Sequence, residues 1–366
     1  MPFHSLTRRH FVASLAGAGA CLAADSGPYP SEAKRYLDEA TENVVIRLTD
    51  PAHQSWLPAC YCRPISRKSD FLIYSSDRSG TVQVYRLDLK NGQSHPLAGA
   101  PDLFTGSLTL GPDDREFAFL AGRSLYMGRT SSAHTREVYR LEEGFKFGTG
   151  LSLSEDGLVS ALVEEKPGMS RLRLINMHTG APATVVESAD PITDAQPRPK
   201  RAGLLYRRND SLWLVNYDAA QNRKLQIAPG GLGTALWSAD GRTLDYLNIP
   251  ADRKQLNNIR ELTPDTNEDQ FVSSTSQFAV FNRNSDTSVF VGASGSKASP
   301  YVLLLVRSVK RELPLCGHRA SDPRLVTSFF SPNSQRVIFQ SDRDGKLALY
   351  SIAVDRLVEE TESEVP

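Results

Sequence analysis

The sequence has 366 residues, of which 42 are basic and 42 acidic, so its formal net charge is zero. A balanced charge gives no electrostatic footprint for nucleic acid or for a membrane surface, which argues against both as partners. The length allows two domains, but no linker rich in Pro, Gly or Ser divides the chain, and we expect one folded unit.

The first 24 residues have the features of an export signal. Arg8 and Arg9 are followed by a mildly apolar run, rich in Ala and Gly, that reaches Ala24. This run is too short to span a membrane. Paired arginines, an apolar run and small residues in this order are typical of a twin-arginine signal peptide rather than of a frayed basic terminus. We therefore expect residues 1–24 to be removed and the protein to be periplasmic or secreted.

Two further segments lie outside the main repeat of the chain. Residues 25–43 are polar and contain one helical phrase, Ser31–Leu37, so they predict a linker or a short helix. Residues 359–366 are acidic and poor in apolar side chains, which predicts a disordered tail.

Cysteine usage predicts packing residues. Cys60, Cys62 and Cys316 remain after removal of the signal, and an odd number argues against a disulfide framework. A bridge between Cys60 and Cys62 would be strained, and a lone C-x-C supplies too few ligands for a metal. Cys21 follows Ala18-Gly19-Ala20, which lacks the branched residue of a lipobox, so we expect no lipid anchor there.

Residues 44–358 are organised by a repeat. The phrase Ser-Asp-Arg-x-Gly occurs at 76–80 and again at 341–345, each time between two β-rich runs. Polar turns lead into β-rich runs from positions 66, 111, 154, 198, 238, 282 and 331. Their spacing of about 44 residues is typical of propeller blades with four short strands. The sequence therefore predicts an all-β fold, a seven-bladed β-propeller over residues 44–358.

A ring of blades must close, because its first and last sheets would otherwise present unpaired strand edges. The β-rich run Val44–Thr49 has no partner in the first unit, and the last unit lacks an outer strand after Asp355. We expect these two to pair, so that an N-terminal strand closes the propeller. An open β-solenoid or two β-sandwiches would not explain both features.

No short catalytic motif is present, since the sequence contains no G-x-S-x-G, H-E-x-x-H, Walker loop or pair of C-x-x-C. Two histidines fall where propellers form a central mouth. His53 precedes the first strand of the first unit, and His318 lies in the loop that leads into the last unit. Because these units are neighbours in the ring, we expect both histidines to face one pocket and to bind substrate, with a structural role as the alternative.

Several phrases occur in an order that is found in one family of propellers. They are Ile46–Thr49, Leu212–Asn216, Leu236–Gly241, Tyr301–Leu303, Leu315–His318 and Val337–Asp342. With these phrases the chain resembles the oligogalacturonate lyases, which are seven-bladed propellers, over residues 44–356. The hairpin phrases are shared with TolB-like propellers, so the order of the phrases and the Leu-Cys-x-His element carry the resemblance.

The resemblance implies a chemistry. Oligogalacturonate lyases cleave short pectin fragments by β-elimination, with a divalent metal, usually manganese, in the central mouth. The reaction needs a base for the proton next to a carboxylate and cations for the charge that develops. In the family a histidine, a glutamine and two further histidines bind the metal, and an arginine and a histidine lie at the reacting sugar. An acidic oligosaccharide is the partner that this resemblance implies.

The sequence departs from the family at the metal positions. The first metal histidine aligns with Gln277, and the Gln-x-x-His-x-His cluster aligns with Asp322, Leu325 and Thr327. Leucine cannot ligate a metal, so Gln277 and Asp322 remain as the candidate oxygen ligands for manganese or another divalent metal.

The reacting-site positions also differ. The histidine aligns with Thr234 and the arginine with Ser211, and neither hydroxyl is a base at neutral pH without activation. Arg198 is a third candidate for substrate binding, because Arg198-Pro199 matches an Arg-Pro phrase of the family and a guanidinium fork suits uronate carboxylates. Turn chemistry between two prolines is the alternative for this arginine.

Two hypotheses of function remain. In the first, the chain is an oligogalacturonate-lyase-like enzyme that acts on pectin oligogalacturonides through a rearranged site. In the second, it is a non-catalytic, TolB-like propeller that binds an oligosaccharide or a protein in the periplasm. The replaced residues favour a lyase-like scaffold that has lost the known mechanism of the family.

Overall fold

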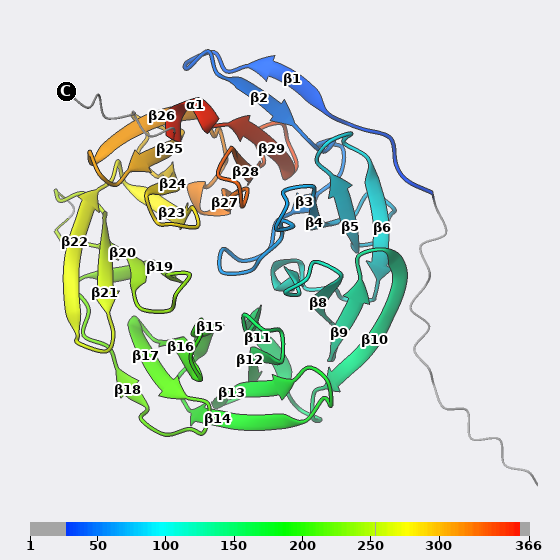
Figure 1. The fold of residues 1–366 in the computed structure, drawn as a ribbon, viewed down its shortest axis with the longest axis vertical. Coiled ribbons are helices and arrows are strands. Elements are labelled where there is room, and N and C mark those ends of the chain that lie inside the picture. The colour runs from blue at the N-terminus through cyan, green and yellow to red at the C-terminus, as the bar shows by residue number, and fades with distance from the viewer. Residues whose placement is uncertain (1–26, 253, 359–366) are drawn as a thin grey trace, which may run out of the picture.

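The computed structural model describes residues 27–252 and 254–358, which form seven antiparallel sheets around a central axis (Figure 1). The prediction of an all-β, seven-bladed propeller is confirmed. The predicted signal peptide, with Cys21, and the predicted tail at 359–366 lie outside the described residues.

Each blade follows the chain from its inner to its outer strand. Blade 1 contains β3 (Ser55–Trp56), β4 (Phe71–Ser76), β5 (Gln83–Asp88) and β6 (Ser94–Gly99). Blade 2 contains β7 (Thr109–Leu110), β8 (Glu116–Ala121), β9 (Ser124–Arg129) and β10 (Ser132–Arg140). Blade 3 contains β11 (Lys146–Leu153), β12 (Val159–Lys166), β13 (Met169–Asn176) and β14 (Pro182–Ser188). Blade 4 contains β15 (Ile192–Pro197), β16 (Gly203–Arg208), β17 (Ser211–Asn216) and β18 (Arg223–Lys224).

The remaining three blades follow the same order. Blade 5 contains β19 (Gly231–Trp237), β20 (Leu244–Ile249), β21 (Asn258–Thr263) and β22 (Glu268–Ser274). Blade 6 contains β23 (Phe278–Arg283), β24 (Val289–Ser294), β25 (Tyr301–Val306) and β26 (Arg311–Gly317). Blade 7 contains β27 (Ser328–Phe330), β28 (Arg336–Ser341), β29 (Ala348–Ala353), β2 (Val44–Arg47) and β1 (Lys34–Leu37).

The described helices are short, namely η1 (Thr105–Ser107), η2 (Pro323–Leu325) and α1 (Asp355–Val358). Among the described residues, none of them has the length and apolar character needed to cross a membrane.

The repeated polar turns join the first and second strands of the blades. In four of them the first serine accepts a hydrogen bond from the backbone N–H that opens or precedes the second strand. The pairs are Ser66 with Phe71, Ser154 with Val159, Ser238 with Thr243 and Ser331 with Arg336. A serine hydroxyl can satisfy backbone donors where the chain reverses, which explains why this residue recurs at the blade period.

The core lies between neighbouring blades. The second strand of six blades carries a fully buried aromatic ring: Tyr74, Phe119, Tyr206, Tyr246, Phe290 and Phe339. Burial of such a side chain stabilises a fold by about 1.5–3 kcal/mol. Since each ring packs between two sheets, these residues hold neighbouring blades together.

The ring closes as the sequence predicts. β2 pairs antiparallel with β29, with Val45 opposite Ile352 and Arg47 opposite Tyr350. The N-terminal strand therefore supplies the outer strand that the last unit lacks.

The prediction of a linker or short helix over residues 25–43 misses a strand. β1 pairs with β2 along its whole length, from Lys34 opposite Arg47 to Leu37 opposite Val44. Without β1, the outer edge of β2 would present unpaired backbone groups. This pairing outweighs the weak helical preference of the segment, because intrinsic propensity is easily overridden by tertiary contacts.

One loop runs into the centre of the ring. Residues 57–70 connect β3 to β4 and extend towards the axis (Figure 1). We call residues 58–63 of this loop the plug. It is tied to blade 3 by Cys62 Sγ, which donates to Leu151 O (3.2 Å), and to blade 6 by Asn282 Nδ2, which donates to Cys60 O (3.2 Å). The thiols are free, and burial raises the pKa of Cys60 to about 12, so they pack as neutral groups.

Candidate functional site

The connections of the blades emerge on two faces of the ring. The loop face carries the connections between consecutive blades and the turns between second and third strands. Contacts join these two sets: Gln54 N donates to Asp77 Oδ1 (2.8 Å) in blade 1, and Ser321 N donates to Asp342 Oδ1 (2.9 Å) in blade 7. The turn face carries the turns between first and second strands.

A cavity of about 840 Å³ opens on the loop face beside the plug. Its wall contains the aromatic rings of Tyr61, Phe104 and Phe147. Phe104 is 37% exposed, and its ring meets Phe147 edge to face with 5.9 Å between the centroids. The helix η1 fixes Phe104, since Ser107 donates to Phe104 O from its backbone N–H (3.0 Å) and from its hydroxyl (2.8 Å). The cavity therefore has a fixed, exposed ring at its edge.

The ionisable groups of this loop-face cavity are mainly acidic. They are Asp102, Lys146, Glu165 and Asp194. Lys146 Nζ lies 3.7 Å from Glu165 Oε2, so this pair is neutral overall. Arg207, outside the cavity, lies 3.5 Å from Asp194 Oδ2. The lining thus offers carboxylate acceptors for hydroxyl groups and a net negative charge.

His318 does not face this cavity. It is 4% exposed, its Nδ1 accepts from Ala320 N (3.0 Å), and its Nε2 therefore carries the proton and donates to Ser294 O (2.9 Å). Burial lowers the pKa of this imidazole, which favours the neutral form. Both ring nitrogens are used inside the protein, which favours the structural alternative for His318 over substrate binding.

His53 lies half-buried in the loop before β3, and its backbone N–H donates to Asp50 O (3.2 Å). Within the described residues, no hydrogen bond of its side chain is found, and neither His53 nor His318 lines the loop-face cavity. The two histidines therefore do not share a pocket there, and substrate binding by His53 stays a prediction.

Arg198 lies on the turn face, opposite the loop-face cavity. Its side chain is 5% exposed and forms a fork on Asp265, with Nη1 to Oδ1 at 2.8 Å and Nη2 to Oδ2 at 2.7 Å. Its Nε donates to Gly241 O (2.7 Å). We expected the guanidinium of Arg198 to bind a uronate carboxylate, but in the structure it binds Asp265 and links blade 4 to blade 5. The predicted contact to substrate is thus taken by a protein carboxylate.

Comparisons with known proteins find propellers of the same fold. No family model matches the chain. The oligogalacturonide lyase of Pectobacterium atrosepticum is 22% identical over 370 residues, which cover 86% of this chain and 94% of the lyase. A solved oligogalacturonate lyase in complex with manganese superposes with a TM-score of 0.84 at 20% identity, covering 90% of this chain and 98% of that one. The lyase of Vibrio parahaemolyticus gives 0.84 at 21% identity, covering 91% and 100%.

The chain is thus a seven-bladed propeller similar to the oligogalacturonate lyases. At these identities the solved structures show the fold, and the similarity spans the whole ring rather than single hairpins. The activity has to be argued from the residues of this chain.

The residues of this lyase-like propeller do not fit the manganese that its structural neighbour holds. Asp322 caps η2 through Arg324 N (2.9 Å) and pairs with the Arg324 side chain, with Nη2 2.6 Å from Oδ2. These hydrogen bonds lower the pKa of Asp322. Gln277 Nε2 donates to Gln255 O (3.4 Å), and Leu325 places an apolar side chain, 38% exposed, at a third ligand position.

These contacts favour structural roles for Gln277 and Asp322, and metal binding by them stays a prediction. The two segments do meet, because β23 contacts η2, but Asp322 is paired with Arg324, and Gln277 Nε2 donates within the protein. The described residues contain no group of three or more His, Cys, Asp or Glu side chains that could hold a metal ion.

The reacting-site positions of the lyase-like propeller carry hydroxyl groups. Thr234 lies in β19 where the pairing with β20 shifts between Leu232 and Ala235, and Ser211 begins β17. Arg207 brings a guanidinium to this part of the loop face by donating to Gly233 O. A cation is thus present near Thr234.

The sequence analysis did not predict the plug or the aromatic lining of the loop-face cavity. A signal was present, since 14 residues, 57–70, separate the first two strands of blade 1, whereas the other blades use short turns. A long loop inside a compact repeat is usually functional.

Proposed function

We propose that this chain is a carbohydrate-binding propeller that keeps the oligogalacturonate lyase scaffold and binds pectin-type oligosaccharides on its loop face, without the manganese-dependent elimination. We place it in the periplasm or outside the cell, on the strength of the twin-arginine phrase at Arg8 and Arg9. One observation carries the proposal: the aligned metal position Asp322 is already paired with Arg324, and Leu325 has no donor atom.

The chemistry of β-elimination explains why this observation matters. A base must take the proton next to the uronate carboxylate while cations neutralise the charge that develops. Thr234 and Ser211 occupy the positions of the family's histidine and arginine, and their hydroxyls do not titrate near neutral pH. Binding needs less than catalysis does, because a cavity with aromatic and acceptor groups can hold a sugar without moving a proton.

The loop-face cavity supports binding of hydroxyl-rich ligands. The exposed ring of Phe104 offers a flat apolar surface, and the carboxylates of Asp102, Glu165 and Asp194 are acceptors for sugar hydroxyls. Their net negative charge disfavours a chain of free uronates. Methyl-esterified or neutral oligosaccharides should therefore bind this cavity more tightly than the free acids.

The test combines a reaction assay with calorimetry on the purified protein. Galacturonate oligosaccharides are mixed with the protein, with and without manganese, and ultraviolet absorbance detects an unsaturated uronate product. We expect no metal-dependent rise, but heat of binding with the methyl-esterified oligosaccharide, which Phe104→Ala should reduce. A metal-dependent rise would show that the lyase reaction survives. If neither a rise nor heat of binding is seen, the carbohydrate proposal fails and a protein partner becomes the better hypothesis.

A further inference from the structure

A second cavity, of about 450 Å³, lies on the turn face, on the other side of the plug. Tyr61 lines both cavities, so the plug separates them. The walls of the turn-face cavity come from the turns of blades 3 to 7 and include the aromatic rings of Trp237 and Phe330. The volume lies within the range of small-molecule sites and has room for a mono- or disaccharide.

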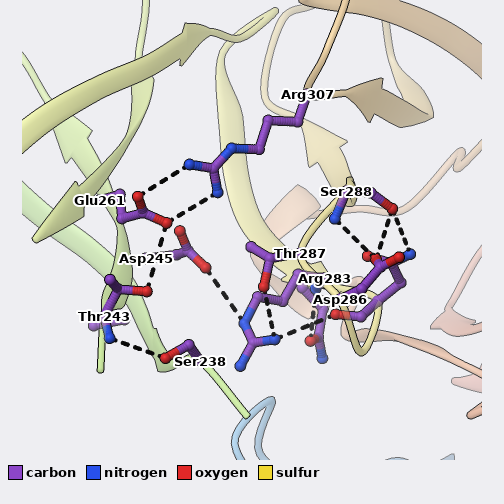
Figure 2. A network of polar contacts seen from close by, with 12 residues as sticks. Ser238, Thr243, Asp245, Glu261, Arg283, Asp286, Thr287, Ser288 and Arg307 are labelled. Carbon is purple, nitrogen blue, oxygen red and sulfur yellow. Dashed lines mark hydrogen bonds and ion pairs between the residues drawn. The ribbon is translucent and has the colours of Figure 1, made fainter. Parts of the chain in front are cut away.

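Arg283 lies in the wall of this cavity and has a guanidinium nitrogen that donates to no described residue. Its Nε lies 3.4 Å from Asp245 Oδ2, and its Nη1 donates to Asn284 O (3.2 Å) and Thr287 Oγ1 (3.3 Å). Figure 2 shows the guanidinium between Asp245 and the turn that contains Asp286, with its second terminal nitrogen left without a partner among the described residues. The side chain is 11% exposed, so an anion in the cavity can reach it.

Trp237 supplies a second unused donor. It is 5% exposed, and its buried indole Nε1 has no hydrogen-bond partner in the described part of the chain. A buried donor without a partner carries a desolvation cost, and this cost disappears when a ligand offers an acceptor. The guanidinium of Arg198 lies 5.1 Å from the centre of the Trp237 ring, which fixes the ring in the wall.

The lining of the turn-face cavity contains more cations than carboxylates, unlike that of the loop-face cavity. Its ionisable lining groups are Arg63, Glu155 and Arg283, two cations against one carboxylate. Arg63 is bound to Asp114 and to Gly111 O, so Arg283 is the cation with a free nitrogen. The free nitrogen of Arg283 therefore favours an anionic ligand on this face.

We propose that the turn-face cavity binds a mono- or disaccharide that carries a carboxylate, with Arg283 as the carboxylate partner and Trp237 as donor to a sugar oxygen. Arg283 can add one charge-assisted hydrogen bond to the ligand, and the rings of Trp237 and Phe330 supply apolar surface. The site lies on the opposite face from the positions that align with the lyase site, and it does not depend on the proposed function of the loop face.

The test is calorimetric titration of the full chain with galacturonate, with galactose as the uncharged match and succinate as a carboxylate without a sugar. Galacturonate should bind about tenfold more tightly than either control, the value of one charge-assisted hydrogen bond. Trp237→Phe keeps the ring and removes the donor, and should weaken binding about fivefold. Arg283→Lys keeps a charge beside Asp245 and should abolish the preference over galactose.

Two further variants make the outcome unambiguous. Glu155 is exposed on its turn, so Glu155→Gln leaves the fold intact and should tighten galacturonate binding about threefold by removing a like charge. Phe104→Ala, in the other cavity, should leave this binding unchanged. Three outcomes would each overturn the proposal. The first is absence of galacturonate binding, and the second is equal affinity for galacturonate and succinate. The third is loss of galacturonate binding in Phe104→Ala while Trp237→Phe and Glu155→Gln have no effect.

Discussion

Replacing Asp245 by asparagine should remove a pH dependence from the stability of the fold. Asp245 lies in β20 and is fully buried, and neither of its carboxylate oxygens has a hydrogen-bond partner among the described residues. Its partner is Arg283, 3.4 Å away, while the neighbouring Glu261 is held by Arg307 at 2.9 and 3.0 Å (Figure 2). Burial raises the pKa of Asp245 to about 7, against the attraction of Arg283, which lowers it.

The sign and size of the effect follow from this pKa. In the unfolded chain an aspartate titrates near 3.9, so at about pH 5.5 the folded protein holds a proton on Asp245 that the unfolded chain has released. The free energy of unfolding therefore falls as the pH rises from 5.5 to about 7, by roughly 1.4 kcal/mol per unit and about 2 kcal/mol in total. Above the folded pKa both states are ionised, and Asp245 has no further effect.

Urea unfolding at 25 °C, followed by tryptophan fluorescence at pH 5.5, 6.5 and 7.5, measures this difference. The unfolding free energy of Asp245→Asn, relative to wild type, should rise by about 2 kcal/mol across the range, because the amide does not titrate. Other groups, such as His318, titrate in both proteins and cancel. Asp240→Asn is the control. Asp240 is exposed, and a hydrogen bond from the backbone N–H of Arg242 lowers its pKa, so this substitution should change the pH dependence of the unfolding free energy only at lower pH. Parallel profiles for wild type and Asp245→Asn would show that Asp245 is already ionised at pH 5.5.

Three other substitutions test separate parts of the argument. Arg198→Ala should lower the free energy of unfolding by about 1.5 kcal/mol in urea titrations, because it removes the fork on the partly exposed Asp265 and the hydrogen bond to Gly241 O, and an unchanged midpoint would refute a packing role. Arg8→Lys combined with Arg9→Lys should stop export in a host with a twin-arginine pathway, seen by cell fractionation, whereas normal export would refute the signal assignment. Restoring His, Gln, His and His at positions 277, 322, 325 and 327 should create manganese binding measurable by calorimetry, and failure to bind would show that the alignment of these positions is wrong.

The fold could be predicted from sequence because its signals are local and repeated. Turn serines such as Ser154 and Ser238 accept a hydrogen bond from a backbone N–H five residues later, at the start of a second strand. The spacing of these serines in the sequence therefore gives the blade period. The closing strand Val44–Arg47 could be found because a ring requires a partner for each edge. β1 could not, because its strand form depends on an edge that only the closed ring creates.

The site residues were harder to predict, since their roles depend on partners that are remote in sequence. Arg198 is separated from Asp265 by 67 positions, and His318 from Ser294 by 24. Nothing near Arg198 in the chain distinguishes a fork on a protein carboxylate from a fork on a ligand. No sequence motif marks Arg283 as a candidate binding residue. Only the geometry of its contacts shows that one of its nitrogens is free.

The plug lies between two cavities with different linings. Tyr61 lines both cavities, while Cys60 and Cys62 bind opposite sides of the ring. A variant that regains manganese binding on the loop face should therefore leave binding of galacturonate on the turn face intact, and coupling between the two would show that the plug transmits between the faces rather than separating them.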